Sequence, residues 1–268
     1  MSTKGWSVAD IADLTGMTAV VTGANRGIGL EVTRGLACNG AHVVLAVRRT
    51  DRGDAAAAAI RATSPGASLE VMALDLADLA SVHRFAAAVR SRWDPLDLLI
   101  NNAGVGSASL RRTADGFELV FGTNHLGHFA LTGLLLPALT RPPPARVVTV
   151  ASLAHGRGHI DFDNLDASKG YANFQTYSQS KLANVLFAYE LHRRLSAAGA
   201  GPLSVAAHPG WAATDMNIRP LEERRRLRDE LALKLTRRLA ATPAQGAQPI
   251  LYAATSPQVR GGDYIGPG

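Results

Sequence analysis

The chain has 268 residues and a formal net charge of +6; 47% of its residues are hydrophobic and 19% are charged. These values exclude a disordered chain and fit one large α/β domain or, less readily, two small ones. Because no linker-like segment interrupts the sequence, we predict a single domain over residues 1–268. The single cysteine, Cys38, excludes an intrachain disulfide framework and is typical of a reducing compartment. Because the sequence shows no secretory leader and no run of about 20 apolar residues, we expect a cytoplasmic protein with no membrane partner.

Short β-branched runs alternate with helical patterns along the chain. The predicted strands comprise residues 17–22, 42–47, 69–74, 96–100, 146–150, 203–207 and 262–265. The predicted helices are one that follows Gly29 and runs through Ala37, and segments 51–62, 78–92, 117–139, 177–195, 221–241 and 243–254. Such alternation predicts a mainly parallel sheet of seven strands with helices on both faces, because right-handed crossovers join parallel strands.

Much of the positive charge lies in the predicted helix 221–241, which contains Arg224, Arg225 and Arg226. A solvated helix face explains this run more simply than a polyanion site does. No zinc-finger, RNP or basic-zipper pattern accompanies it, so we predict no nucleic-acid partner.

A glycine-rich turn, Gly23-Ala24-Asn25-Arg26-Gly27-Ile28-Gly29, joins the first predicted strand to the first predicted helix. Its three glycines allow a tight turn, close approach of the backbone to a phosphate and close packing of helix on strand. The N–H groups at the start of the helix can then bind a pyrophosphate. A P-loop is excluded because no Gly-Lys-Ser/Thr follows. The turn therefore predicts a doubly wound Rossmann fold that binds a dinucleotide.

The residues after the second predicted strand indicate which dinucleotide binds. NAD-binding folds place a carboxylate there for the ribose 2′-hydroxyl, whereas this chain has Arg48 and Arg49. Two guanidinium groups can hold a 2′-phosphate, and Arg26 in the glycine turn can add a third. We predict that NADP(H) is preferred, with NAD(H) possible; the alternative is that these arginines are solvated loop residues.

Tyr177 and Lys181 are four residues apart in a predicted helix, so both side chains reach one small volume. A phenol beside an ammonium is a candidate acid/base pair, because the positive charge lowers the pKa of the tyrosine. The same spacing arises by chance in many amphipathic helices, so the assignment depends on the rest of the chain.

Several motifs in the expected order resemble the short-chain dehydrogenase/reductase family. They are Thr22-Gly23-x-x-x-Gly27-x-Gly29, Asp75-Leu76, Asn101-Asn102-Ala103-Gly104, Asn124, Ser152 after a strand, Tyr177-x-x-x-Lys181 and His208-Pro209-Gly210. Within the family, residues 124–129 together with 177–181 are similar to the retinol dehydrogenase and protochlorophyllide reductase branch. The resemblance covers almost the whole chain and is far more specific than any single motif.

The resemblance implies an oxidoreductase acting on a carbonyl or alcohol. Tyr177 would be the general acid/base, Ser152 would hydrogen-bond the substrate oxygen, Lys181 would hold the nicotinamide ribose, and Asn124 would anchor a water. The residues expected to bind the cofactor are Gly23, Asn25, Arg26, Gly27, Ile28, Gly29, Arg48, Asp75, Leu76, Asn102, Ala103, Gly104, Tyr177, Lys181, Pro209, Gly210 and Thr214. A small helical lobe within about residues 211–241 would bind the substrate, which we expect to be a hydrophobic small molecule. A homo-oligomer is possible.

Two other interpretations of the chain are weaker. A catalytically silent NADP(H)-binding regulator would not need the complete set of Asn124, Ser152, Tyr177 and Lys181. A metal site around His155 and the polar residues that follow it lacks cysteine and a repeated His spacing, so we predict no metal. Relatives in this branch commonly continue beyond a segment like 261–268, so we expect a C-terminal flap to be missing or shortened in this sequence. They are also often membrane-anchored, which we do not expect here because no membrane segment is recognised.

Overall fold

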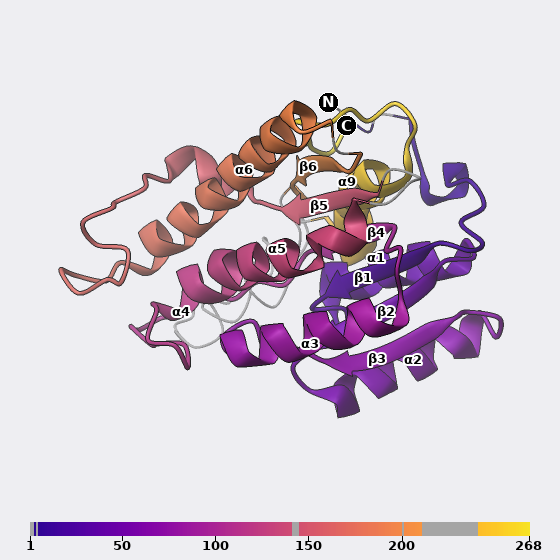
Figure 1. Ribbon diagram of the computed structural model, residues 1–268, viewed down its shortest axis with the longest axis horizontal. Helices are drawn as coiled ribbons and strands as arrows, with labels where there is room; N and C mark the ends of the chain where they lie inside the picture. Colours follow the sequence, from indigo (N-terminus) through magenta and orange to yellow (C-terminus); the bar gives the residue numbers. More distant parts are fainter. Residues whose placement is uncertain (1–2, 4, 141–144, 200, 211–240) are drawn as a thin grey trace, which may run out of the picture.

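Seven β-branched and apolar runs form the strands of one sheet. They are β1 (Thr18–Thr22), β2 (His42–Val47), β3 (Leu69–Ala73), β4 (Leu98–Asn101), β5 (Arg146–Val150), β6 (Leu203–Ala207) and β7 (Tyr264–Ile265). The computed structural model describes residues 3, 5–140, 145–199, 201–210 and 241–268; within them the strands are all parallel, in the order β3-β2-β1-β4-β5-β6-β7 (Figure 1). The predicted doubly wound Rossmann fold is confirmed.

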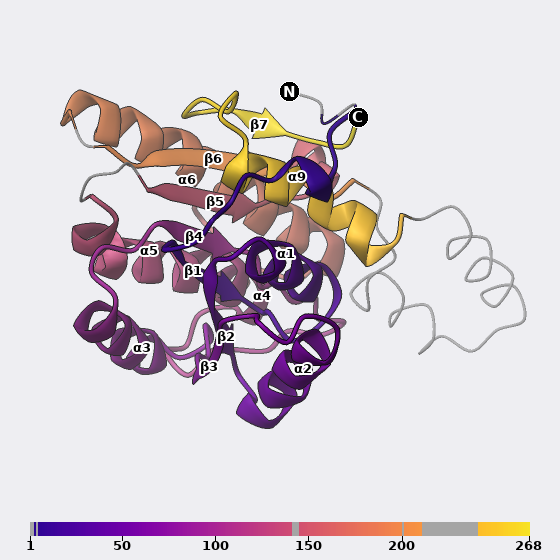
Figure 2. The same ribbon diagram turned by 90° about the vertical axis from the view of Figure 1, so that its right-hand side faces the viewer.

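Long helices of the described residues cover both faces of the sheet, as Figure 2 shows. One face is covered by α1 (Gly27–Cys38), α2 (Thr50–Thr63) and α9 (Pro243–Thr255), and the other by α3 (Leu79–Arg92), α5 (Gly127–Leu139) and α6 (Asn173–Ala197). Successive strand residues point to opposite faces, so Val20 packs under α3 and α5 while Val21 packs under α1. Burial on both faces explains why the strands are continuous apolar runs rather than alternating ones.

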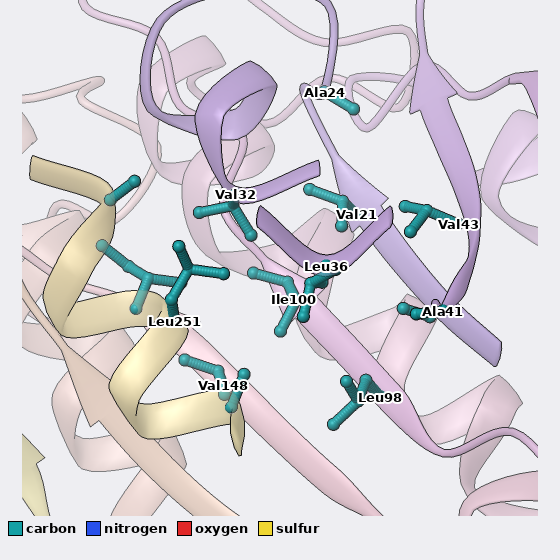
Figure 3. Close-up of a cluster of buried hydrophobic side chains, with 14 of the residues drawn as sticks. Val21, Ala24, Val32, Leu36, Ala41, Val43, Leu98, Ile100, Val148 and Leu251 are labelled. Atoms are coloured by element: carbon teal, nitrogen blue, oxygen red, sulfur yellow. The ribbon is translucent and has the colours of Figure 1, made fainter. Parts of the chain in front are cut away.

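The first and last helices pack directly on one another. Figure 3 shows Val32 and Leu36 of α1 and Leu251 of α9 gathered over the strand residues Ile100 and Val148. Gly35 permits this contact, because a Cβ at that position would lie 2.7 Å from Leu251 Cδ1. The sequence thus joins its two ends in a single apolar layer.

The segment predicted as one helix over residues 117–139 is divided into three. Glu118 caps the start, its carboxylate accepting the N–H groups of Val120 (2.8 Å) and Phe121 (2.7 Å). A short turn α4 (Leu119–Phe121) is followed by the π-helical turn η2 (Gly122–Leu126) and then by α5. A π-helical turn has wider hydrogen-bond spacing than the α-helix and is frequent at functional sites.

This same stretch corrects the expectation that the chain contains no apolar segment of membrane-spanning size. Among the described residues, Leu119–Leu139 has the length and the mean hydropathy (1.2) of a membrane span, and 56% of the window is buried. Polar residues in η2 interrupt the apolar run, which hides it when only consecutive apolar residues are counted. In the structure it is the crossover between β4 and β5, with α5 packed beside α3 and η2 beside α6. This packing explains its apolar character as that of a core helix.

The helix α6 begins at Asn173, four residues before the predicted start at Tyr177. Its first turn is mostly exposed and lacks apolar periodicity, so the sequence pattern does not reveal it. Tyr177 therefore lies in the second turn of α6, with helical residues both before and after it. The predicted lobe within about residues 211–241 lies, apart from Ala241, outside the described residues.

Candidate active site

A cleft of about 440 Å³ opens at the carboxyl ends of the central strands. The chain leaves β1 toward β2 on one side and returns at β4 on the other, so the cleft lies where the strand order reverses. Open α/β sheets bind their ligands at this point. Predicted site residues that line the cleft are Gly23, Asn25, Arg26, Gly27, Ile28, Gly29, Arg48, Asp75, Leu76, Asn102, Ala103, Gly104, Ser152, Tyr177, Lys181, Pro209 and Gly210.

Two predicted site residues are not placed in this lining. Asn124 is buried beside the cleft, while its neighbour Thr123 lines it. Thr214 lies outside the described residues. The remaining predicted residues are thus brought to one cleft, and the roles assigned to them stay predictions.

The glycine turn has the shape that a phosphate-binding backbone requires. Gly23 and Gly27 adopt φ values of 66° and 54°, which favour glycine. A Cβ at Gly29 would lie 2.4 Å from the Gly23 carbonyl oxygen and 2.5 Å from Asn102 Nδ2, whereas one at Gly27 would meet no described atom within 4 Å. One glycine therefore permits close packing and the other leaves backbone open to the cleft at the start of α1. These residues fit a dinucleotide.

Thr22 holds the two loops at the strand-order reversal together. Its hydroxyl oxygen lies 2.9 Å from the backbone nitrogens of both Asn102 and Ala103. The Asn102 side chain returns a bond, donating from Nδ2 to the Thr22 carbonyl oxygen at 2.8 Å. The predicted Asn102-Ala103-Gly104 segment is thereby fixed against the glycine turn.

Four arginines line one end of the cleft: Arg26, Arg48, Arg49 and Arg52. Arg49 is paired with Asp51, with Nε 3.1 Å from Oδ1 and a terminal nitrogen 2.6 Å from Oδ2. This pairing raises the pKa of Arg49 and lowers that of Asp51. Arg52, in the first turn of α2, is the lining cation that sequence reasoning missed, although its spacing of four residues from Arg48 was available as a signal.

Ser152 and Tyr177 meet on the opposite side of the cleft. Ser152 follows β5 and caps the short turn η3 (Leu153–Arg157), with its hydroxyl accepting the N–H of Ala154 at 3.2 Å. Burial raises the pKa of Tyr177, and a hydrogen bond from Ser152 opposes that rise. The expectation that this pKa is lowered is therefore wrong for the structure: burial of the phenol is the largest effect, and the net shift is upward.

Lys181 is only 2% exposed. Its ammonium donates to the Val150 carbonyl oxygen at 3.0 Å and lies 5.8 Å from the centre of the Tyr177 ring. Burial lowers the pKa of Lys181 from 10.5 to about 8. The lysine is therefore tied to the end of β5, one turn of helix from Tyr177.

The burial of Lys181 predicts pH-dependent stability. Between pH 8 and pH 10.5 the unfolded chain holds a proton on this lysine that the folded chain has released. The free energy of unfolding should therefore rise with pH across this window, by up to about 3 kcal/mol in total, and the penalty should be fully present below pH 8. Urea midpoints at about pH 7.5 and about pH 9.5 check the sign. The wild type should gain stability relative to Lys181→Met, and equal gains would contradict the assignment.

Asn124 is fully buried in the π-helical turn. Its side chain accepts from the Val105 N–H (2.8 Å) and donates to the Val105 carbonyl (3.1 Å) and to the Ser180 hydroxyl oxygen (3.1 Å). Ser180 in turn donates to the Tyr177 carbonyl oxygen at 2.7 Å. Asn124 thus joins a loop that lines the cleft to the helix that carries Tyr177, and its expected role as a water anchor stays a prediction.

The polar loop after Ser152 is bound to the protein itself. His155 Nδ1 lies 2.7 Å from the Ser152 carbonyl oxygen, and the Asp161 N–H donates to the Gln179 side chain at 2.9 Å. In the described part of the chain, no group of three or more His, Cys, Asp or Glu side chains is placed to hold a metal ion.

A family model described as "short chain dehydrogenase" matches residues 17–225, from β1 past the His208-Pro209-Gly210 loop. The chain belongs to the short-chain dehydrogenase family. Retinol dehydrogenase 11 of Mus musculus is 44% identical over 241 residues, which cover 90% of this chain and 74% of that protein. The predicted resemblance to the retinol dehydrogenase branch and the prediction of an oxidoreductase are thereby confirmed.

Solved structures superpose on almost the whole chain. An uncharacterised protein from Mycobacterium paratuberculosis is 43% identical, with a TM-score of 0.80, over 98% of this chain and 85% of that one. A protein described as an NAD(P)-dependent gluconate 5-dehydrogenase from Beutenbergia cavernae, with bound NADP, is 28% identical, with a TM-score of 0.73, over 95% of this chain and 96% of that one. Relative to curated proteins of the family, this short-chain dehydrogenase spans 62% to 78% of their lengths.

Proposed function

We propose that the protein is an NADP(H)-dependent carbonyl reductase or alcohol dehydrogenase. The observation that carries this proposal is the meeting of Ser152, Tyr177 and Lys181 in the cleft that the glycine turn also lines. When bound, NADP(H) supplies or accepts the hydride. The glycine turn and the Asn102-Ala103-Gly104 segment would hold it, with the arginine end of the cleft toward the ribose 2′-phosphate.

The protein's own residues then move and hold the proton. The Tyr177 hydroxyl gives a proton to the substrate oxygen in reduction and takes one in oxidation, while Ser152 hydrogen-bonds the same oxygen. Burial raises the pKa of Tyr177, which favours the neutral phenol that carbonyl reduction requires. Lys181, one helical turn away, stabilises the phenolate that remains after the proton has left.

The preference for NADP(H) is proposed from the arginines that line the cleft. Asp51 already neutralises Arg49, so Arg48 and Arg52 are the stronger candidates for the 2′-phosphate. Replacing Arg48 by Asp should weaken NADPH binding at least about 10-fold, because a charge-assisted contact is lost and a like charge is gained. NADH binding should change much less.

Arg49→Ala is the matched control for Arg48→Asp, since Arg49 already has a carboxylate partner. Titration of each variant with NADPH and with NADH gives the ratio of the two dissociation constants. If Arg48→Asp leaves this ratio at the wild-type value, Arg48 does not select the nucleotide.

The names of the relatives suggest the class of substrate. Curated relatives are retinol dehydrogenases, whose named substrate is an alcohol on a long apolar chain. We propose a hydrophobic alcohol or aldehyde for this chain as well. NADPH oxidation in the presence of retinal, nonanal, a quinone and a polar keto-sugar tests the class: turnover confined to the apolar carbonyls is expected. Turnover of the keto-sugar alone would contradict it.

The same assay separates the enzyme from the catalytically silent regulator, which would bind NADPH without turnover on any carbonyl. Cytoplasmic location and a homo-oligomer are proposed from the sequence only. Cell fractionation and light scattering on the purified protein test these two points, and recovery in the membrane pellet would contradict the first.

A further inference from the structure

His128 is a buried titratable residue that the proposed mechanism does not use. It is the second residue of α5 and is 1% exposed. Its Nδ1 lies 3.0 Å from the Asn124 carbonyl oxygen and its Nε2 lies 2.9 Å from the Thr22 hydroxyl oxygen. A carbonyl oxygen can only accept, so Nδ1 carries the ring proton and donates it. In the neutral ring, Nε2 then offers a lone pair to Thr22.

The hydrogen bonds around Thr22 agree with this assignment. Its hydroxyl oxygen already accepts the backbone N–H groups of Asn102 and Ala103. Its own proton can reach two acceptors, His128 Nε2 at 2.9 Å or the Ile100 carbonyl oxygen at 3.3 Å. The shorter distance favours donation to His128. The imidazole thus completes the group that fixes the Asn102-Ala103 loop at the cleft.

The other ring nitrogen, Nδ1, contacts the residues that lead to Tyr177 and Lys181. It holds the carbonyl of Asn124 in the π-helical turn, and the Asn124 side chain binds Val105 and Ser180. Ser180 lies between Tyr177 and Lys181 and donates to the Tyr177 carbonyl. His128 therefore links two parts of the cleft. On one side, hydrogen bonds lead to Thr22 and the Asn102-Ala103 loop; on the other side, they lead through Asn124 and Ser180 to α6, which carries Tyr177 and Lys181.

We propose that His128, as the neutral tautomer protonated on Nδ1, is a positioning residue that fixes the catalytic helix relative to the dinucleotide loops. The inference rests on the proposed function only in assigning the cleft to a dinucleotide. Burial supports the neutral ring, because it outweighs the Asn124 hydrogen bond, which raises the pKa of His128. With smaller contributions from the charges of Lys181 and His125, burial lowers this pKa from 6.5 to about 3.

Three substitutions separate the two contacts of the imidazole. His128→Gln places an amide near the position of Nε2 and can keep the Thr22 contact, whereas His128→Asn places it near Nδ1 and can keep the Asn124 contact. His128→Leu keeps neither. The free energy of unfolding of each variant, with the NADPH dissociation constant and the exchange rate of the Val105 amide, reports on the two sides separately.

We expect His128→Gln to bind NADPH within about 2-fold of wild type and to exchange the Val105 amide about 10-fold faster. His128→Asn should show the reverse, with NADPH binding about 10-fold weaker and wild-type exchange at Val105. His128→Leu should show both losses. Equal effects of the Gln and Asn variants on both readouts would reduce His128 to a packing residue and overturn the proposal.

A measurement on the wild-type protein covers the case in which the variants do not fold. Nitrogen-15 NMR should show His128 Nδ1 protonated and Nε2 unprotonated, with no titration from about pH 8 to about pH 5. The opposite tautomer, or protonation near pH 6.5, would refute the assignment. If the wild type binds no nucleotide, the proposed function fails, while the tautomer and the Val105 exchange still decide the role of His128.

Discussion

Tyr177→Phe is expected to lower kcat by at least about 1,000-fold while leaving the NADPH dissociation constant within about 2-fold of wild type. The phenol is the only group of the Ser152, Tyr177 and Lys181 set that is placed as a proton donor of raised pKa. Phe keeps the ring and its packing, so cofactor contacts along the cleft are retained. Steady-state reduction of the best aldehyde substrate, together with an NADPH titration, measures both quantities.

Tyr252→Phe is the matched control for this experiment. Tyr252 lies in α9, away from the cleft lining, and its hydroxyl donates to the Gln258 side chain at 3.1 Å. Its loss should cost about 1 kcal/mol of stability and leave kcat unchanged. Retained turnover in Tyr177→Phe would remove Tyr177 from the chemistry and would direct attention to Ser152.

Gly29→Ala should abolish useful dinucleotide binding. The new Cβ would lie 2.4 Å from the Gly23 carbonyl oxygen and 2.5 Å from Asn102 Nδ2, so the glycine turn and the Asn102 loop must move apart. Overpacking of this kind costs about 1–3 kcal/mol, which corresponds to a fall in melting temperature of several degrees. Because both displaced loops line the cleft, we expect NADPH affinity to fall about 100-fold or more.

Gly133→Ala provides the comparison at a glycine of similar helical setting. Gly133 is an exposed residue of α5 where a Cβ would meet no described atom within 4 Å, so the variant should be as stable as wild type or slightly more stable. Thermal unfolding with and without NADPH measures both effects. A Gly29→Ala protein that still gains wild-type stability from NADPH would show that the close packing of α1 on the loops is not needed for binding.

The strands and most helices were predictable because the fold is governed by burial. Runs such as residues 43–47 and 205–207 are apolar and buried on both faces, which is typical of strands in a covered parallel sheet. The glycine turn is likewise predictable from sequence, since the positive φ values of Gly23 and Gly27 favour glycine. The motif residues line one cleft because parallel strands place their carboxyl ends on the same edge of a sheet.

Features that depend on contacts between distant residues were not predictable. The π-helical turn arises within a continuous helical pattern and is accompanied by the Asn124 and His128 contacts, which involve residues far away in sequence. The pKa of Tyr177 is another example, because the helical spacing shows Lys181 nearby but not how deeply both are buried. The position after the second strand indicates Arg48 and Arg49 but not Arg52, and the pairing of Arg49 with Asp51 is visible only in three dimensions.

The contact between α1 and α9 has a consequence for biosynthesis. Nearly every residue that lines the cleft has been synthesised once the chain reaches residue 210. Leu251, which packs against Gly35 of α1, is added some 40 residues later. Until then the apolar side of α1 has no cover from α9. We expect a nascent chain arrested before residue 243 to be a client of chaperones and a poor nucleotide binder, so that cofactor capture follows the synthesis of α9.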